Sequence, residues 1–184
     1  MRLTELRTSI DDLALISSEQ SQPRSVGLHV SSIIRHIMVT SGLAKDSNFT
    51  DEDLEYFAVV GRLWERVLAE TMLPEPRYIR PGEIEVDGII GSPDGIDTED
   101  PAVIEIKVTW LSSNRAIESF FKYMLQIKSY AYMLGLTKVK LYVFYVCGNY
   151  RPPVPQFKAW EITFTEAELR TNWHVMKENA RTMT

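Results

Sequence analysis

The chain has 184 residues, of which 45% are hydrophobic and 24% charged; this is the composition of one globular domain with a full-sized core, and it excludes disordered and fibrous proteins. The formal net charge of −5 argues against a protein that coats nucleic acid by bulk attraction, although a local basic strip can still track DNA. Cys147 is the only cysteine, which excludes an intrachain disulfide framework and a four-thiolate iron–sulfur cluster. No apolar run approaches the ~20 residues of a bilayer span, so we expect a cytoplasmic protein without membrane contact.

The N-terminal part of this single domain, about residues 1–73, is predicted to be helical. Apolar residues recur at helical spacing in three stretches, 3–19, 28–39 and 51–72. The third stretch begins in the style of a capping box, with Asp53 three residues after Thr50. We expect its apolar face to be part of the core. That face comprises Leu54, Phe57, Ala58, Gly61, Trp64, Val67, Leu68 and Met72.

The central part, about residues 76–147, is predicted to hold most of the sheet. Its predicted strands cover residues 77–79, 83–90, 102–110 and 140–147. The first should be a short edge strand, and the last, nearly continuous in apolar residues, a central strand covered on both faces. The two middle strands alternate in character, and we expect a hairpin through residues 97–101 to return the chain.

A long helix is predicted over about 115–134, with Gly135 ending it. The C-terminal part, about 156–183, should add a strand over 157–164, at an edge of the sheet, and a helix to about Arg181 that Thr165 and Glu168 cap. The chain has no internal repeat and no Walker-type phosphate loop, which argues against an intrinsic ATP motor. The predicted fold class is therefore α/β, with a mixed central sheet flanked by helices.

Two acidic side chains and a lysine stand out in the middle strands. Glu105 and Lys107 share one face of the strand over 102–110, and Asp94 lies in a Pro-Asp-Gly turn that the hairpin brings near Glu105. Two carboxylates so placed can hold one hard cation through oxygen, as Mg²⁺ or Mn²⁺ prefers. The alternative interpretation is an ordinary turn followed by a solvated strand with an ion pair.

These residues form a pattern that resembles the PD-(D/E)XK nuclease superfamily, with Pro93-Asp94 and Glu105-Ile106-Lys107 as its two halves. The helix residues Gln126 and Tyr130 look like the Gln-x-x-x-Tyr motif of the branch that holds lambda-type exonucleases and RecB-like nucleases. The wording around Ser92-Pro93-Asp94-Gly95, and Gly61-x-x-Trp64-Glu65 upstream, is most similar to the lambda exonuclease (YqaJ-like viral recombinase) group.

The resemblance covers about residues 24–147 and implies a restriction-endonuclease-like core with a metal-dependent nuclease activity. The implied activity is exonucleolytic, on the ends of linear double-stranded DNA, with 5′-phosphorylated products, in phage-type recombination or repair. Relatives work beside a single-strand annealing protein in the host cytoplasm, and lambda-type enzymes form a ring-shaped trimer. We expect these partners from the resemblance alone.

The resemblance also implies roles for the acidic cluster. Asp94 and Glu105 would hold Mg²⁺, with Mn²⁺ as a substitute and the Ile106 carbonyl as a further ligand. Glu65 would reach the metal directly or through water, although an exposed glutamate is the alternative. Lys107 would orient the attacking water or help to remove its proton.

Further residues are candidates for binding the DNA. Ser92 and Gln126 would lie near the terminal phosphate, and Tyr130 would brace the glutamine or touch DNA. A plain helix surface is the competing interpretation for both helix residues. His29 is a candidate for an additional metal ligand, against a packed or surface histidine.

An arginine before a serine-containing helix helps lambda-type enzymes hold the DNA 5′-phosphate. By that resemblance Arg24 is a candidate, together with Ser31 or Ser32, and Arg35 is a substitute for Arg24. An arginine gripping phosphate does so bidentately, and a helix N-terminus adds backbone donors. A solvent-facing arginine is the alternative in each case.

Two rival functions remain open from the sequence. One is an endonuclease of the same fold, such as a restriction or junction-resolving enzyme, for which a specificity region would have little room in 184 residues. The other is a non-catalytic DNA-binding module on the same scaffold, which the presence of all three of Asp94, Glu105 and Lys107 argues against.

Overall fold

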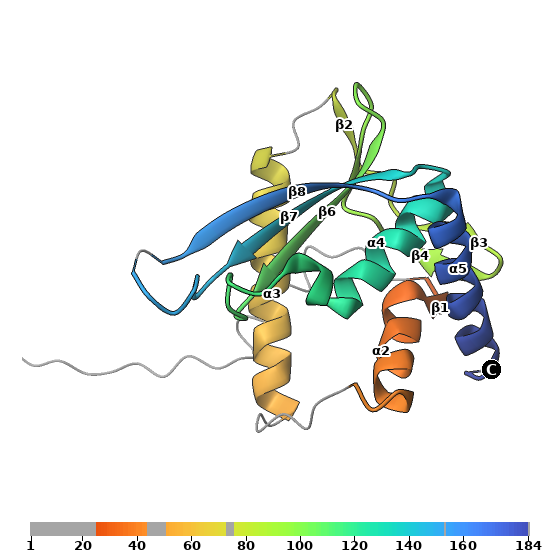
Figure 1. Ribbon diagram of the computed structural model, residues 1–184, viewed down its shortest axis with the longest axis horizontal. Coiled ribbons are helices and arrows are strands. Elements are labelled where there is room, and N and C mark those ends of the chain that lie inside the picture. Colours follow the sequence, from red (N-terminus) through yellow and green to blue (C-terminus); the bar gives the residue numbers. More distant parts are fainter. Residues whose placement is uncertain (1–24, 44–50, 73–75, 153, 184) are drawn as a thin grey trace, which may run out of the picture.

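The computed structural model describes residues 25–43, 51–72, 76–152 and 154–183, and within 51–72 the side chains of 57 and 59–71. The predicted helix over 3–19 and the candidate Arg24 lie outside the described residues. In chain order the elements (Figure 1) are β1 Leu28–His29, α2 Val30–Thr40, α3 Asp51–Met72, β2 Tyr78–Ile79, β3 Ile84–Val86, β4 Ile89–Gly91, β5 Gly95–Asp97, β6 Ala102–Thr109, a 3-10 turn Ile117–Ser119, α4 Phe121–Leu134, β7 Lys138–Tyr145, β8 Gln156–Thr163 and α5 Glu166–Arg181.

A mixed five-stranded sheet forms the centre of the fold, in the order β2-β5-β6-β7-β8. β6 and β7 are parallel, and the other neighbouring pairs are antiparallel. Parallel strands need a crossover connection, which α4 supplies between β6 and β7. A second sheet has three strands, in the order β1-β4-β3. The predicted α/β class, with a mixed sheet flanked by helices, is confirmed.

Helices cover the two faces of the central sheet unequally (Figure 1). Because side chains alternate along a strand, Val103 of β6 and Leu141 of β7 face the main core, which α2, α4 and α5 complete. Ile104 and Ile106 point to the opposite face and pack against Ala69 of α3. β6 is thus covered on both sides, which is why nearly all of it is buried.

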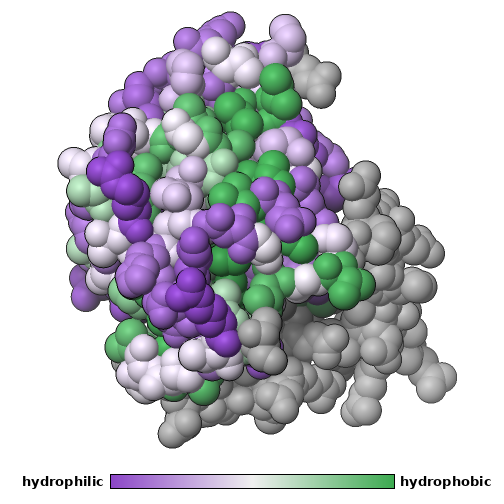
Figure 2. Space-filling model, turned by 90° about the vertical axis from the view of Figure 1, so that its right-hand side faces the viewer, coloured by the Kyte–Doolittle hydropathy of each residue, from purple (hydrophilic) through white to green (hydrophobic). Residues whose placement is uncertain are grey.

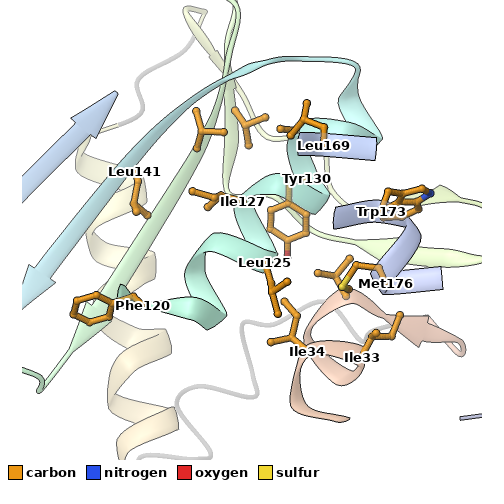
Figure 3. Close-up of a cluster of buried hydrophobic side chains, with 14 of the residues drawn as sticks. Ile33, Ile34, Phe120, Leu125, Ile127, Tyr130, Leu141, Leu169, Trp173 and Met176 are labelled. Carbon is orange, nitrogen blue, oxygen red and sulfur yellow. The ribbon is translucent and has the colours of Figure 1, made fainter. Parts of the chain in front are cut away.

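The main core brings together helices that are distant in the sequence (Figure 3). Each fully buried aliphatic side chain of this kind contributes about 1.5–3 kcal/mol relative to an exposed one. The labelled side chains of the helices are Ile33 and Ile34 of α2, Phe120, Leu125, Ile127 and Tyr130 at or in α4, and Leu169, Trp173 and Met176 of α5.

The predicted single strand over 83–90 is wrong, because the structure has a hairpin there. β3 and β4 pair antiparallel, and the two residues between them, Asp87 and Gly88, have φ of 53° and 76°. Positive φ at both positions is the two-residue hairpin turn that Asp-Gly favours. The alternation of side chains runs through this turn without a break and concealed it. β5, rather than the 83–90 segment, is therefore the hairpin partner of β6.

Two further boundaries depart from the prediction. The helix expected from about 115 begins at Phe121, after the 3-10 turn and a non-helical Phe120 with ψ of 72°. The strand expected over 140–147 is shifted to β7 at 138–145, and only one of its faces is fully buried. Gly135 does end α4, with φ of 65°, and Thr165 and Glu168 form the predicted capping box on α5.

The predicted apolar face of α3 is wrong in part. Trp64 and Val67 are 43% and 52% exposed, whereas Val59 and Ala69 are buried. α3 packs mainly on the single strand β6, so its buried stripe is narrow. Trp64 instead lies beside the Phe144 ring of β7, with ring centroids 5.3 Å apart.

Figure 2 presents one face of the molecule, on which hydrophilic side chains surround a band of hydrophobic ones near its centre. Among the described helices, none combines the length and the apolar character needed to cross a bilayer.

Asp97, which is fully buried at the end of β5, forms ion pairs with Arg77, just before β2, and with Lys140 of β7. Its carboxylate accepts hydrogen bonds from Arg77 at 2.9 Å and from Lys140 of β7 at 2.8 Å. The backbone N–H groups of Glu99 and Asp100 also donate to it, at 3.1 and 3.2 Å. The hydrogen bond from Arg77, followed by that from Lys140, holds the pKa of Asp97 well below its ordinary value of 3.8, against the opposing effect of burial.

This cluster should make stability depend on acid pH. A carboxyl whose pKa is lowered by folding stabilises the fold above pH 3.8, and this contribution is lost as the pH falls toward the lowered value. We expect Asp97→Asn to lower the free energy of unfolding at pH 7 by about 2 kcal/mol, because Arg77 and Lys140 lose their charge-assisted hydrogen bonds to Asp97 while Lys140 keeps its ion pair with Asp100 at 2.7 Å. Urea unfolding at pH 7 and pH 3 measures this, and the difference between variant and wild type should shrink at pH 3.

Glu166→Gln is the matched control, since Glu166 forms an exposed ion pair with Arg170 at 2.8 Å. Exposed pairs contribute about 0–1 kcal/mol, so this variant should unfold almost as the wild type does. Equal losses from the two substitutions would contradict the structural role of Asp97.

Candidate active site

The β5–β6 hairpin places Asp94 beside the middle of β6. Gly95 is paired with Ile104, so Asp94 reaches the strand one step further along. The backbone N–H of Ile106 donates to Oδ2 of Asp94 at 2.7 Å. Asp94 is therefore fixed next to Glu105, as the sequence predicts.

Glu105 and Lys107 form a buried ion pair on the face of β6 that α4 covers. Nζ of Lys107 donates to Oε1 of Glu105 at 2.5 Å, and their side chains are 13% and 2% exposed. Oε2 of Glu105 is buried and, in the described part of the chain, has no hydrogen-bond partner. A buried carboxylate oxygen without a partner is costly, so this oxygen is available to a ligand.

Glu65 joins the cluster from α3, on the other side of β6. It interacts with the backbone amide of Val108, and its charge acts on Lys107 and on Asp94. Of the two predicted interpretations of Glu65, the structure favours the one in which its side chain belongs to the acidic cluster.

Burial and mutual repulsion disturb every charge in this cluster. Burial raises the pKa of Glu105 to about 8, and the charges of Asp94 and Glu65 add to this against the attraction of Lys107. Burial likewise raises the pKa of Asp94 and of Glu65. Burial alone would lower the pKa of Lys107, but the three carboxylates raise it well above its ordinary value. Lys107 is therefore a protonated ammonium group that interacts with three carboxyl groups, those of Asp94, Glu65 and Glu105.

Two tyrosines of α4 interact with this ammonium group. Nζ of Lys107 lies 6.0 Å from the ring centroid of Tyr123, and Tyr130 is only 4% exposed. Burial raises the pKa of both phenols, so both stay protonated. Tyr123 was missed from the sequence, although it stands seven residues, about two helical turns, before Tyr130.

The predicted neighbours Gln126 and Tyr130 do meet on one flank of α4. Nε2 of Gln126 donates to the Tyr130 hydroxyl at 3.0 Å. The burial of Tyr130 contradicts a direct contact with DNA, because its ring is packed in the core. Its other predicted role, bracing Gln126, agrees with this hydrogen bond.

Gly91 allows β4 to pass close under α4. A Cβ at this position would lie 2.8 Å from Sδ of Met133 and 3.0 Å from Cε1 of Tyr130. The absence of a side chain at Gly91 lets the chain run directly from β4 into Ser92 and Asp94. Ser92 is half-buried and lines the same groove as Asp94 and Glu65.

The donor set of this site suits a hard cation. Among the described residues, no three His, Cys, Asp or Glu side chains are arranged so that they could hold a metal ion together, and Glu105 is hydrogen-bonded to Lys107. The unpartnered Oε2 of Glu105 on β6 and the carboxylate of Asp94 just before β5 are nevertheless oxygen donors. Oxygen donors in this arrangement fit Mg²⁺ or Mn²⁺.

The other predicted candidates in the described ranges lie on α2 or at its start. Ser32 and Arg35 are exposed on α2, whose contacts are with α4, α5, β1 and β4. Ser31 lies on the same helix. His29 is buried, and its ring nitrogens meet the Ser25 carbonyl at 2.9 Å and the Glu83 carboxylate at 3.9 Å, which agrees with a packed histidine.

Comparisons with known proteins agree with this architecture. Neither a protein-family model nor a curated protein sequence matches the chain. Among solved structures, the protein SSO0001 is similar with a TM-score of 0.53 and 17% identity, over 92% of this chain and 83% of that one. A phage-related exonuclease from Haemophilus somnus 129PT has a TM-score of 0.51 and 11% identity, over 97% and 93%.

A third solved structure is the alkaline exonuclease LHK-Exo from Laribacter hongkongensis, with a TM-score of 0.49 and 15% identity over 85% of this chain and 89% of that one. The first two similarities extend over nearly the whole of both partners and concern the fold. The fold expected from the resemblance is thereby confirmed, because the chain shares its architecture with a phage-related exonuclease and with SSO0001.

Proposed function

We propose that the protein is a Mg²⁺-dependent deoxyribonuclease that degrades linear double-stranded DNA from its ends and leaves 5′-phosphates on its products. One observation carries the proposal: Asp94, Glu105 and Lys107 meet in a buried cluster, within a fold shared with a phage-related exonuclease. A role in phage-type recombination or repair, a single-strand annealing partner and a ring-shaped trimer belong to the proposal by resemblance only.

Asp94 and Glu105 would hold the cation, with the Ile106 carbonyl as a further ligand and Glu65 in support. When bound, a divalent cation polarises the phosphoryl group and supplies a nucleophilic water at neutral pH. Asp94 is already oriented for this role by the Ile106 N–H, and Glu105 contributes the oxygen that lacks a partner.

Lys107 would stabilise the negative charge that develops on the phosphate and orient the attacking water. Its raised pKa favours this electrostatic role over removal of a proton, because an ammonium group has no free electron pair. Tyr123 keeps one side of the ammonium group apolar and limits the water that competes for it. Ser92 and Gln126 would donate hydrogen bonds to phosphate oxygens from opposite sides of the cluster.

Substitution of the lysine tests the catalytic assignment. We expect Lys107→Ala to lower the cleavage rate of linear duplex DNA by at least about 10²-fold, the scale of losing one preorganised charge donor. Its DNA affinity in Ca²⁺ should stay close to that of the wild type. Single-turnover cleavage with Mg²⁺, and binding with Ca²⁺, measure the two quantities separately.

Lys177→Ala is the control for this experiment. Lys177 lies on α5, outside the acidic cluster, and forms an ion pair at 3.0 Å with Asp87 of the β3–β4 turn. It should cleave at the wild-type rate. Unchanged cleavage by a correctly folded Lys107→Ala variant would show that the assigned role of Lys107 is wrong.

Metal binding can be measured without any DNA. Mg²⁺ or Mn²⁺ should raise the unfolding temperature of the wild type, and the rise should grow with the logarithm of the cation concentration above the Kd, since a ligand that binds only the folded state stabilises it. Glu105→Gln should abolish this rise and leave the metal-free protein at least as stable, because it removes a buried charge from a crowded acidic cluster. A rise in Glu105→Gln equal to that of the wild type would place the cation elsewhere.

The topology of the DNA separates an exonuclease from an endonuclease of the same fold. We expect Mg²⁺-dependent digestion of linear duplex DNA, with a covalently closed circle left intact. End-labelled substrates with and without a 5′-phosphate then report the dependence on the terminal phosphate. Cleavage of the closed circle would favour the endonuclease, and binding of DNA without cleavage of either form would favour a non-catalytic module.

A further inference from the structure

A groove with basic walls opens beside the acidic cluster. On one side, α3 presents Arg62, Glu65, Arg66 and Ala69, whose spacing of three and four residues puts them on a single helix face. Ala69 is buried against β6, and its small side chain lets α3 approach the strand closely. The two arginines therefore flank Glu65 at the edge of this contact.

The opposite wall comes from the chain on either side of the β3–β4 hairpin. Arg80 lies shortly before β3, and Ser92 and Asp94 lie after β4. The cavity between the walls has a volume of about 410 Å³ and is open to solvent. Residues far apart in the sequence thus bring positive charge to the mouth of a cavity that Asp94 lines from within.

The three arginines of the groove differ in the hydrogen bonds and ion pairs that they form. Arg66 donates to Glu70 at 2.8 Å, so its charge is already partly neutralised. Within the described ranges, the guanidinium groups of Arg62 and Arg80 form no hydrogen bond and no ion pair. Their charges act only at longer range, that of Arg62 on Glu65 and that of Arg80 on Asp94 and Glu70.

We propose that Arg62 and Arg80 bind the phosphodiester backbone of a DNA strand next to the bond that is cleaved, with a weaker contribution from Arg66. This inference rests on the proposed function for the identity of the polyanion. A planar guanidinium group grips phosphate oxygens bidentately, and Arg62 and Arg80 have both sets of donors available.

The negative charge of the acidic cluster explains why DNA binding would need basic residues in the groove. Asp94, Glu105 and Glu65 together repel a polyanion, in a chain whose formal charge is already −5. Arg62 and Arg80 are placed where they offset that repulsion for a strand that enters along the groove. Contacts to phosphates carry no sequence information, so the binding they provide is independent of base sequence and sensitive to salt.

The test measures DNA binding in Ca²⁺ by fluorescence anisotropy, using the full chain and a labelled 5′-phosphorylated duplex. We expect Arg62→Ala and Arg80→Ala each to weaken binding about tenfold, equally for duplexes of unrelated sequence. Each should also reduce the slope of log affinity against log salt by about 1. Arg66→Ala should weaken binding less than either.

Arg170→Ala is the matched control, because Arg170 pairs with Glu166 four residues away at 2.8 Å, as Arg66 does with Glu70, but on α5 across the sheet. It should leave both the affinity and the salt slope unchanged. Affinities of Arg62→Ala and Arg80→Ala within twofold of the wild type, or losses no greater than that of Arg170→Ala, would overturn the proposal whether or not the wild type cleaves DNA.

Cleavage assays separate this proposal from the proposed function. If the wild type cleaves, the arginine variants should lose rate at limiting DNA and recover most of it at saturating DNA, which supports both. If the wild type cleaves no DNA while the arginine variants still lose affinity and salt dependence, the groove stands as a phosphate-binding site and the nuclease assignment fails.

Discussion

The hydrogen bond from the Ile106 N–H to the Asp94 carboxylate is the contact on which the site depends. It requires the register in which Gly95 faces Ile104, and that register in turn brings Asp94 level with Glu105 and Lys107. A slip of one residue would turn Glu105 and Lys107 to the opposite face of β6, under α3 instead of α4. The packing of Ile104 and Ile106 against Ala69 opposes such a slip. The slip would turn both isoleucines away from Ala69 and bring charged side chains of β6 into that apolar contact.

The same hairpin carries two acidic groups with opposite electrostatics. Asp97 has Arg77, Lys140 and two backbone N–H donors, and its pKa is lowered, so it is a satisfied structural ion. Glu105 shares a single lysine with Asp94 and Glu65, has one oxygen without a partner, and its pKa is raised. Raised carboxyl pKa values and an unsatisfied buried oxygen mark a site whose charge balance is incomplete without a ligand. This contrast is the physical reason for proposing the ligand site at Glu105 and not at Asp97.

Local sequence signals were sufficient wherever one short segment decides the outcome, as for the capping box at Thr165 and Glu168 or the helix end at Gly135. They were insufficient where packing decides. Asp87 and Gly88 form a hairpin turn in the middle of a predicted single strand, and the alternation of apolar and polar side chains continues through this turn. Trp64 is exposed because α3 packs mainly on the one strand β6. Sequence patterns also place Asp94, Glu105 and Lys107 correctly but say nothing of Arg80 facing Arg62, since only the tertiary fold joins them.

The central claim is that the carboxylates of Asp94, just before β5, and Glu105, on β6, share one divalent cation. Anomalous diffraction from crystals grown with Mn²⁺ tests it directly, because the metal position is observed rather than inferred from activity. The account predicts a strong peak within about 2.0–2.6 Å of a carboxylate oxygen of Asp94 and of Glu105, near the Ile106 carbonyl. Saturating Mn²⁺ that leaves this position empty, with Glu105 still bound to Lys107, would contradict it.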